Sequence, residues 1–212
     1  MIRVKVCGLN DPVNTREVLG AGADFLGFIF YPGSRRYVGD NPAELFRDLP
    51  LHAKKIGVFV DEDPGKVIEV TGQFGLYAVQ LHGHETPVQC RAVRQQGIRV
   101  IKAFGIGGNF EFSPLVGYME VCDYFLFDSQ TRHHGGGGLK FPWQELGKYS
   151  LDKPFFLSGG IEPGDAGTIR GLSHKALFAA DINSRFETGP GIKDARIVKD
   201  FIRDIKNTSY EF

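Results

Sequence analysis

Two side chains in this sequence have the chemistry needed for a pair of proton transfers. Cys7 ends the alternating segment 3–7, and Asp128 directly follows the apolar run 124–127. A thiolate can remove a proton and a carboxylic acid can donate one, so together they could act as general base and general acid. A carboxyl group at the end of a buried run is costly unless it is paired or functional. For Cys7, the alternative is a small buried hydrophobic side chain.

Two further charged residues are expected beside this pair. Lys5 precedes Cys7 by two positions, so both side chains share one face of a strand, and the positive charge should lower the pKa of the thiol. Asp181 follows the apolar run 176–180 and should approach Lys5 where the last strand meets the first. Asp181 could pair with Lys5 or bind a ligand hydroxyl group. A purely structural ion pair is the alternative.

Two segments of small residues indicate phosphate binding. Ser158, Gly159 and Gly160 precede one expected helix start, and Asn183 with Ser184 precedes another helical turn. Backbone N–H groups at helix starts bind phosphate well. The alternative is a set of ordinary tight turns.

The histidines do not predict a metal site. His82 follows Gln80 at the end of an apolar run and is expected to face the mouth of the fold. His84, His133 and His134 have no carboxylate or further histidine at a ligand spacing. We therefore expect no metal.

The elements that position these residues recur along the chain as apolar segments, each followed by a proline. Several prolines stand after a capping residue, as in Asp11-Pro12 and Asp63-Pro64, which is typical of a helix start. Eight such strand–helix units predict an α/β fold, a (β/α)8 TIM barrel, with residues 1–212 as one domain. An open doubly wound sheet is less favoured because no G-x-G-x-x-G follows the first strand. The expected strands are Arg3–Cys7, Phe25–Phe30, Lys55–Val60, Tyr77–Leu81, Val100–Phe104, Tyr124–Phe127, Phe155–Leu157 and Ala176–Ala180. Alternation along them predicts a polar layer inside the barrel, made by Lys5, Gln80 and Lys102.

Two of the loops after strands are long, at residues 31–40 and 129–141. In a barrel, both lie on the face where binding and catalysis occur. The second loop contains Gly135–Gly138, which predicts either a lid or a close approach of the backbone to a ligand. A tolerated flexible insertion is the alternative.

The charge balance and the cysteine content argue against several classes of protein. Lysine with arginine and aspartate with glutamate each number 25, so no overall field favours nucleic acid or an anionic membrane. The apolar runs are shorter than the ~18 residues of a membrane helix. Three cysteines without C-x-x-C spacing indicate a reducing compartment. Because a strand is expected almost at once, leaving no room for a signal peptide, the sequence predicts a cytoplasmic protein.

Taken together, these motifs resemble those of the phosphoribosylanthranilate isomerase family over essentially the whole chain. The resemblance implies that Cys7 is the general base, that Asp128 is the general acid, and that Arg36 binds the anthranilate carboxylate. The chain departs from the family at Arg185, where the family has glycine, and at Leu139-Lys140, so no role is assigned to that lysine. The matching segments are Lys5-Val6-Cys7-Gly8, Gly27–Pro32, Ser34–Tyr37, Ala78–Gly83, Phe127-Asp128, Leu157–Gly160 and Pro190–Asp194.

The reaction implied by this resemblance is an Amadori rearrangement in tryptophan biosynthesis. N-(5-phospho-β-D-ribosyl)anthranilate becomes 1-(2-carboxyphenylamino)-1-deoxy-D-ribulose 5-phosphate, and no cofactor is expected because the iminium intermediate is itself the electron sink. The expected partner is this small phosphorylated substrate, and the expected state is a monomer or a homodimer. The alternatives are the histidine-pathway phosphoribosyl isomerase, which has an aspartate where Cys7 stands, and a non-catalytic barrel that binds a phosphorylated ligand. The expected substrate-binding residues are Arg36, Gln80, His82 and Asp181, and the expected phosphate-binding residues are Gly159, Gly160, Asn183 and Ser184.

Overall fold

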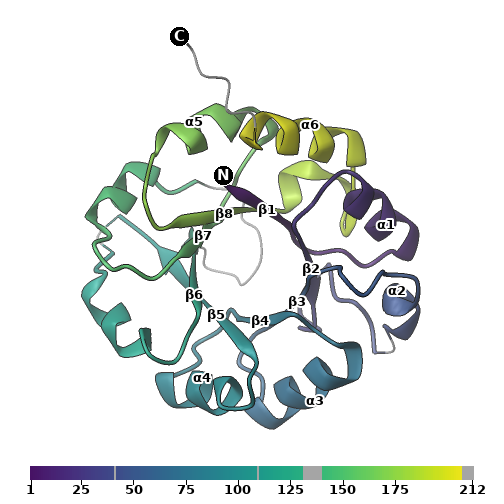
Figure 1. The fold of residues 1–212 in the computed structure, drawn as a ribbon, viewed down its shortest axis with the longest axis horizontal. Coiled ribbons are helices and arrows are strands. Elements are labelled where there is room, and N and C mark those ends of the chain that lie inside the picture. Colours follow the sequence, from purple (N-terminus) through teal and green to yellow (C-terminus); the bar gives the residue numbers. More distant parts are fainter. Residues whose placement is uncertain (41, 109, 131–139, 207–212) are drawn as a thin grey trace.

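Eight parallel strands close into a barrel in the computed structural model, which describes residues 1–40, 42–108, 110–130 and 140–206. In Figure 1 the strands form an inner ring and the helices lie outside it. Each strand pairs with the next along the chain, and β8 pairs with β1 to complete the ring, so the predicted TIM barrel is confirmed. The strands are β1 (Arg3–Val6), β2 (Phe25–Ile29), β3 (Lys55–Phe59), β4 (Ala78–Leu81), β5 (Arg99–Ile106), β6 (Tyr124–Ser129), β7 (Phe155–Leu157) and β8 (Leu177–Ile182).

The outer layer consists of helices of unequal length. Among the described residues, the connections after β5 and β6 contain only 3₁₀ helices, so the expectation of a regular helix after every strand is wrong at these two places. Gly117 and Gly147 lie within these short segments, and glycine disfavours an α-helix. The α-helices are α1 (Pro12–Gly20), α2 (Ala43–Arg47), α3 (Pro64–Phe74), α4 (Pro87–Arg94), α5 (Ala166–Gly171) and α6 (Ala195–Lys206). The 3₁₀ helices are η1 (Ser113–Tyr118), η2 (Trp143–Lys148), η3 (Pro163–Asp165) and η4 (Ser184–Phe186), and a small hairpin is formed by β9 (Glu187–Gly189) and β10 (Ile192–Lys193).

Helix starts follow the predicted combination of a capping residue and a proline. The side chains of Asp11, Asp63 and Thr86 accept hydrogen bonds from backbone N–H groups in the first turns of α1, α3 and α4, each of which begins with proline. In α2, by contrast, Pro42 is itself the capping position and makes no side-chain cap. The cap-and-proline signal therefore locates the three longer of these helices well.

Alternation along the strands divides the core into two parts. Phe25 of β2 packs against Phe156 of β7, with 5.7 Å between ring centroids, although these strands are not neighbours in the ring. Such a contact lies inside the barrel and closes it below the mouth. Val4 and Val6 belong instead to the larger cluster that the surrounding helices cover, as predicted. Residues such as Val70 of α3 and Val198 of α6 complete that outer cluster.

Strand ends differ from expectation by one or two residues. β6 continues to Ser129 and β8 to Ile182, so Asp128 and Asp181 each lie one position before the end of a strand. Cys7 follows β1, and its N–H still donates to the Ile182 carbonyl oxygen at 2.9 Å. The three side chains therefore stand at the C-terminal mouth of the barrel, where the sequence places them.

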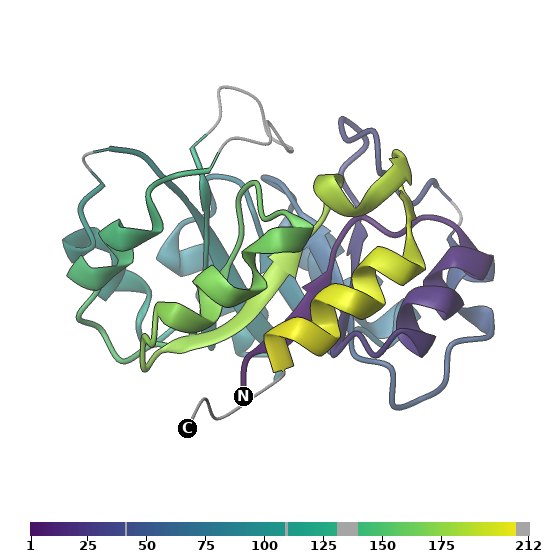
Figure 2. The same cartoon turned by 90° about the horizontal axis from the view of Figure 1, so that it is seen from above.

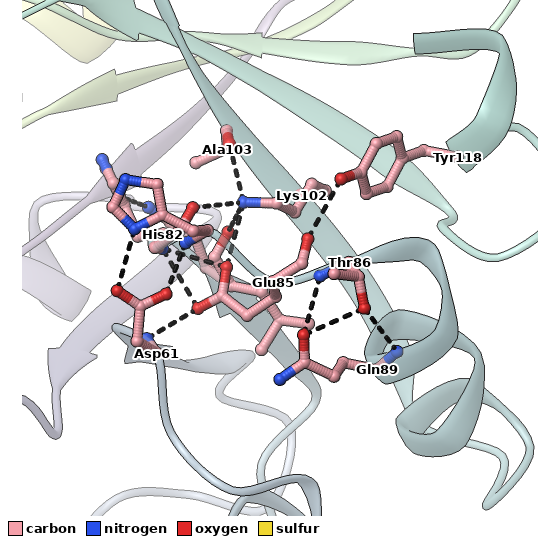
Figure 3. Close-up of polar contacts among 12 residues, drawn as sticks. Asp61, His82, Glu85, Thr86, Gln89, Lys102, Ala103 and Tyr118 are labelled. Atoms are coloured by element: carbon pink, nitrogen blue, oxygen red, sulfur yellow. Dashed lines mark hydrogen bonds and ion pairs between the residues drawn. The ribbon is translucent and has the colours of Figure 1, made fainter. Parts of the chain in front are cut away.

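Lys102 does not join the polar layer inside the barrel, which corrects the prediction. Its neighbours Ile101 and Ala103 belong to the interior cluster, so alternation sends Lys102 outward. The buried ammonium group pairs with Glu85 at 3.0 Å and donates to the carbonyl oxygens of Leu81, Gly83 and Ala103. Figure 3 shows this amino group among its acceptors. The pair ties β5 to the loop after β4.

The loops that line the mouth gather on one side of the molecule. Figure 2 shows the loop after β2, in blue-purple, and the yellow-green segment after β8 rising on the same side. No helix in the described part of the chain is long and apolar enough to cross a membrane.

Candidate active site

The floor of the mouth is a buried ion pair centred on Lys5. Its ammonium group donates to Asp181 Oδ2 at 2.8 Å and to Gln80 Oε1 at 2.7 Å, and the side chain is fully buried. Burial opposes the charge of Lys5, but the negative charges of Asp181 and Cys7 outweigh it, so the pKa of Lys5 lies above its usual value. The predicted Lys5–Asp181 pair and the inward positions of Lys5 and Gln80 are confirmed. Asp181 Oδ1 makes no hydrogen bond with a described residue.

Cys7 stands above this floor in a tightly packed position. A Cβ atom on Gly27 of β2 would lie 2.9 Å from Cys7 Sγ, so glycine is needed there to make room for the thiol. Burial raises the pKa of the Cys7 thiol, although the charges of Lys5 and Lys193 act in the opposite direction. The expectation of a lowered pKa is therefore wrong, because burial disfavours the thiolate more than the charges of Lys5 and Lys193 favour it.

A chain of polar contacts runs from this floor to Asp128. Gln80 Nε2 lies 2.6 Å from His82 Nδ1, and His82 Nε2 lies 3.4 Å from Asp128 Oδ2. The imidazole and the carboxylate are both about one-quarter exposed, at 28% and 25%, so both can reach a bound molecule. The chain places His82 at the mouth, as expected, and leads from Asp128 to Lys5, whose charge acts on the Cys7 thiol.

The loop after β7 packs directly beside Asp128. Gly159 has φ of +90°, and a Cβ there would lie 3.0 Å from Asp128 Oδ1 and 2.6 Å from the Ser129 nitrogen. Only glycine fits this close approach without strain. The backbone that is expected to bind phosphate therefore borders the expected general acid.

The loop after β2 contributes Arg36, whose guanidinium is already engaged. Its Nε and Nη2 atoms donate to the two carboxylate oxygens of Glu187, at 2.8 and 2.7 Å. Lys193 also donates to Glu187 and, at 2.6 Å, to Asn183 Oδ1. A Cβ on Gly8 would lie 2.6 Å from Arg36 Cδ, so the group packs against the backbone next to the thiol. Two cations and one carboxylate thus flank Cys7, and we call Arg36, Glu187 and Lys193 the cation cluster.

Burial sets the protonation behaviour of the cation cluster. It lowers the pKa of Lys193 to about 8, partly offset by Glu187. Burial also opposes the charge of Glu187, but hydrogen bonds from Arg36 and the charge of Lys193 outweigh it, so the pKa of Glu187 lies below its usual value. Sequence reasoning assigned no role to Glu187 or Lys193. The available signal was their place in the segment after β8, on the active face of a barrel.

The two phosphate-loop segments lie after neighbouring strands, because β7 pairs with β8. Gly159 and Gly160 both have positive φ, and Ser184 begins the 3₁₀ helix η4. The side chain of Asn183 is held by Lys193, which leaves its backbone as the group able to meet a ligand. The structure thus brings these four residues to one side of the mouth. The glycine run 135–138 lies outside the described residues.

A cavity of about 470 Å³ opens beside Asp128. Among the described residues, no group of three histidine, cysteine, aspartate or glutamate side chains could hold a metal ion. The cavity is lined by His82, Gly83, His84, Lys102, Ala103, Phe104, Gly105, Tyr118, Asp128, Ser129 and Gln130.

Comparisons with known proteins agree with this geometry. Residues 4–204 match the family described as PRAI, N-(5'phosphoribosyl)anthranilate (PRA) isomerase. A protein of Phocaeicola vulgatus named N-(5'-phosphoribosyl)anthranilate isomerase is 42% identical over 203 residues, which cover 96% of this chain and 97% of that protein. A crystal structure of a phosphoribosyl anthranilate isomerase in complex with reduced 1-(o-carboxyphenylamino)-1-deoxyribulose 5-phosphate superposes with a TM-score of 0.82 at 33% identity, covering 97% of this chain and 99% of that one. A structure of mutually generated monomers of the dimeric enzyme from Thermotoga maritima gives a TM-score of 0.81 at 32% identity, covering 98% and 100%.

Proposed function

Because the chain belongs to the N-(5'-phosphoribosyl)anthranilate isomerase family, its reaction is the Amadori rearrangement of phosphoribosylanthranilate in tryptophan biosynthesis, and we propose that Cys7 and Asp128 carry out the two proton transfers. The observation that supports this assignment is the position of both side chains at the barrel mouth: polar contacts lead from Asp128 through His82 and Gln80 to Lys5, whose charge acts on Cys7. General acid and base groups must meet the same substrate, and this mouth provides that meeting place.

The first step is opening of the ribose ring. Asp128 donates its proton to the ring oxygen while the bond between that oxygen and C1 breaks. The nitrogen lone pair forms a C1=N bond, which leaves a positively charged iminium and a new hydroxyl group at C4. Asp128 becomes a carboxylate, and the Ser129 N–H, 2.7 Å from Asp128 Oδ1, stabilises the negative charge.

The second step is removal of the C2 proton by the Cys7 thiolate. The electrons of the C2–H bond form a C1=C2 bond, and those of the C1=N bond return to nitrogen, which gives a neutral enolamine. Transfer of the C2 hydroxyl proton to C1 then yields the ketone. Lys5 and Lys193 both favour the thiolate against the effect of burial. The iminium adds a third positive charge at the moment the base is needed.

Substrate binding is assigned to residues around this pair. Arg36 binds the anthranilate carboxylate, because its Nη1 group is not used by Glu187. Asp181 Oδ1, which makes no hydrogen bond with a described residue, accepts from a ribose hydroxyl group. His82 borders the ribose. Both ends of the Gln80 side chain contact other residues, so Gln80 supports the binding site from below.

The phosphate is assigned to the backbone of Gly159 and Gly160 together with that of Asn183 and Ser184. Positive φ angles at both glycines and the helical turn at Ser184 support this assignment. Titration of ¹⁵N-labelled protein with inorganic phosphate should shift the amide signals of these four residues. Shifts confined to the surroundings of Arg36 would place the anion elsewhere.

The compartment and the oligomeric state of the protein are also proposed. We place the chain in the cytoplasm, since Cys7, Cys90 and Cys122 are all free and buried, as expected in a reducing compartment. The chain is a single domain that acts as a monomer or a homodimer. Sedimentation equilibrium across a range of concentrations separates these two states.

The decisive experiment is a turnover assay with freshly prepared phosphoribosylanthranilate. The fluorescence of the anthranilate group should change as the substrate is consumed, and the carboxyphenylamino-deoxyribulose phosphate should accumulate in equal amount. The histidine-pathway aminoimidazole substrate serves as the control. Turnover of that compound alone would assign the chain to the other reaction.

A further inference from the structure

We propose that Gln80 is a positioning residue that fixes the proton of the His82 imidazole on Nε2, and so keeps the acidic proton of Asp128 directed at the substrate. The inference rests on the general-acid role proposed for Asp128. It concerns side chains that do not themselves exchange protons with the substrate. The observation that supports it is a continuous series of polar contacts from Lys5 through Gln80 and His82 to Asp128.

The direction of this chain is set at its buried end. An ammonium group has donors and no acceptor, so the Gln80 atom that faces Lys5 at 2.7 Å must be the amide oxygen. Lys5 is itself held by Asp181 at 2.8 Å and is fully buried, so it has no freedom to turn away. The amide of Gln80 therefore has one orientation, with its NH₂ group toward the mouth.

That orientation determines which nitrogen of His82 carries the proton. The NH₂ group of Gln80 lies 2.6 Å from His82 Nδ1 and can only donate, so Nδ1 must accept. An imidazole that accepts at Nδ1 is neutral and carries its single proton on Nε2. The protonated Nε2 atom then lies 3.4 Å from Asp128 Oδ2. Such contacts are commonly long in ligand-free sites and shorten in the complex.

The position of this proton matters for a general acid. An Nε2–H donor points at a carboxyl oxygen without a proton, so the acidic proton of Asp128 is left free to face the ribose ring oxygen. After the transfer, the same N–H group stabilises the carboxylate. In the other tautomer, the Nε2 lone pair would accept the Asp128 proton and turn it away from the substrate. Only the tautomer selected by Gln80 is compatible with both stages.

The test is Gln80→Glu, which keeps the shape and changes the NH₂ group into an acceptor. His82 Nδ1 must then donate, so the imidazole either presents a lone pair to Asp128 or becomes an imidazolium that holds Asp128 as a carboxylate. Both states remove the acidic proton from the substrate. The expected loss in kcat is about 10²-fold or more, the usual range for a missing general acid. An unchanged kcat would overturn the proposal.

Nuclear magnetic resonance reports the tautomer without any turnover. In protein labelled with ¹⁵N at histidine, His82 should show a protonated Nε2 and an unprotonated Nδ1, and Gln80→Glu should protonate Nδ1. His174 is the internal reference, because the Ala176 N–H donates to its Nδ1 and its Nε2 faces the Tyr149 carbonyl oxygen. A protonated Nδ1 on His82 in the wild-type protein would refute the assignment.

Two further variants separate positioning from damage to the fold. Gln89→Glu makes the same chemical change on α4, where the side-chain oxygen already accepts from the Thr86 nitrogen at 2.8 Å, so activity should be unchanged. Gln80→Met introduces no acceptor and leaves both tautomers accessible, so its loss of kcat should be smaller than that of Gln80→Glu. If Gln80→Met lost as much kcat as Gln80→Glu, or more, the proposal would be wrong. Gln80 would then matter only for its volume or for its hydrogen bond with Lys5.

The double variant with Asp128→Asn shows whether Gln80 acts through the acid. With the acidic proton already missing, Gln80→Glu should change kcat by no more than about twofold. An undiminished loss in that background would contradict the proposal. Absence of turnover in the wild-type protein would instead overturn the proposed function. The NMR measurement would still show which nitrogen of His82 carries the proton, because it does not depend on turnover.

Discussion

Replacing Arg36 with methionine should raise KM for phosphoribosylanthranilate about tenfold and reduce kcat much less. The guanidinium is assigned to the anthranilate carboxylate, which lies far from the bonds that change. Its contact with the carboxylate is therefore made equally in the ground state and in the transition state. Loss of such uniform binding appears in KM.

The size of the effect follows from the contacts that Arg36 already makes. A guanidinium has five N–H donors, and Glu187 takes one on Nε and one on Nη2. The edge formed by Nη1 and the second Nη2 hydrogen remains for the substrate. A hydrogen bond to a charged group contributes about 1.5–3 kcal/mol. Because Glu187 shares the positive charge, we expect the lower end, about 1.5 kcal/mol, which corresponds to about tenfold in affinity.

The assay combines the variant with a substrate that lacks the carboxylate. N-(5-phosphoribosyl)aniline should bind the wild-type protein about as weakly as phosphoribosylanthranilate binds Arg36→Met, and the variant should lose nothing further with it. Arg36→Lys keeps the charge without the planar edge and should recover part of the affinity. If Arg36→Met lost kcat while KM stayed unchanged, or weakened both substrates equally, the assignment of Arg36 to the carboxylate would be wrong.

Three other predictions test the proton-transfer pair, the buried pair outside the barrel and the acidity of the thiol. Cys7→Ser and Asp128→Asn should each lower kcat by about 10²–10⁴-fold with little change in KM, and steady-state kinetics showing the loss in KM alone would contradict both roles. Lys102→Met leaves the Glu85 carboxylate buried without its cation and should destabilise the fold by about 3–5 kcal/mol in urea unfolding, whereas adding Glu85→Gln should recover part of that loss. Because burial raises the pKa of the thiol, alkylation of Cys7 in the ligand-free protein should begin only above the pH range of an ordinary cysteine. Lys5→Met removes the largest charge that favours the thiolate, and the pKa of Lys5 itself lies above its usual value, so the variant should move that profile to still higher pH; a shift to lower pH would refute the electrostatic assignment.

The barrel could be predicted from the sequence because the alternation of side chains along each strand shows which residues face inward and which face the helices. Alternation placed Val4 and Val6 on the helix-covered side and Lys5 inside, and both statements hold. The inward position of Gln80 holds for the same reason. These outcomes depend only on the two-residue period of a strand and on closure of the ring.

Lys102 shows where that reasoning fails. Its strand position and alternation were taken to place Lys102 inside the barrel, but Ile101 and Ala103 occupy the inward positions of β5. The buried charge is compensated by Glu85, which lies in the loop after β4 and also accepts from the Asp61 and Gly83 nitrogens. Glu85 lies in a loop, 17 residues before Lys102. Because a loop has no regular side-chain periodicity, the sequence pattern does not identify Glu85 as the partner.

The cation cluster was missed for a related reason. Arg36 and Glu187 are separated by 151 residues; Arg36 lies in the loop after β2, and Glu187 begins β9 of the small hairpin after β8. The sequence could suggest that Arg36 binds a carboxylate. It gave no sign that the ligand-free protein supplies one of its own, because strand and helix patterns do not specify how two loops meet.

The charges at the mouth favour one order of events. In the ligand-free protein, Lys5 is matched by Asp181, and the cation cluster has a net charge near +1 while Lys193 is protonated. This charge suits the arriving carboxylate of the substrate, and burial keeps the Cys7 thiol protonated. Ring opening then creates the iminium beside that thiol, and a new positive charge in a desolvated site lowers a thiol pKa. In the mechanism that we propose, the thiol proton then passes to water at the mouth, and the iminium formed after transfer of the Asp128 proton stabilises the thiolate that acts as the base in the second step. On this proposal, the raised pKa of the thiol fits the order of the two steps, since Cys7 becomes a base only after Asp128 has donated its proton.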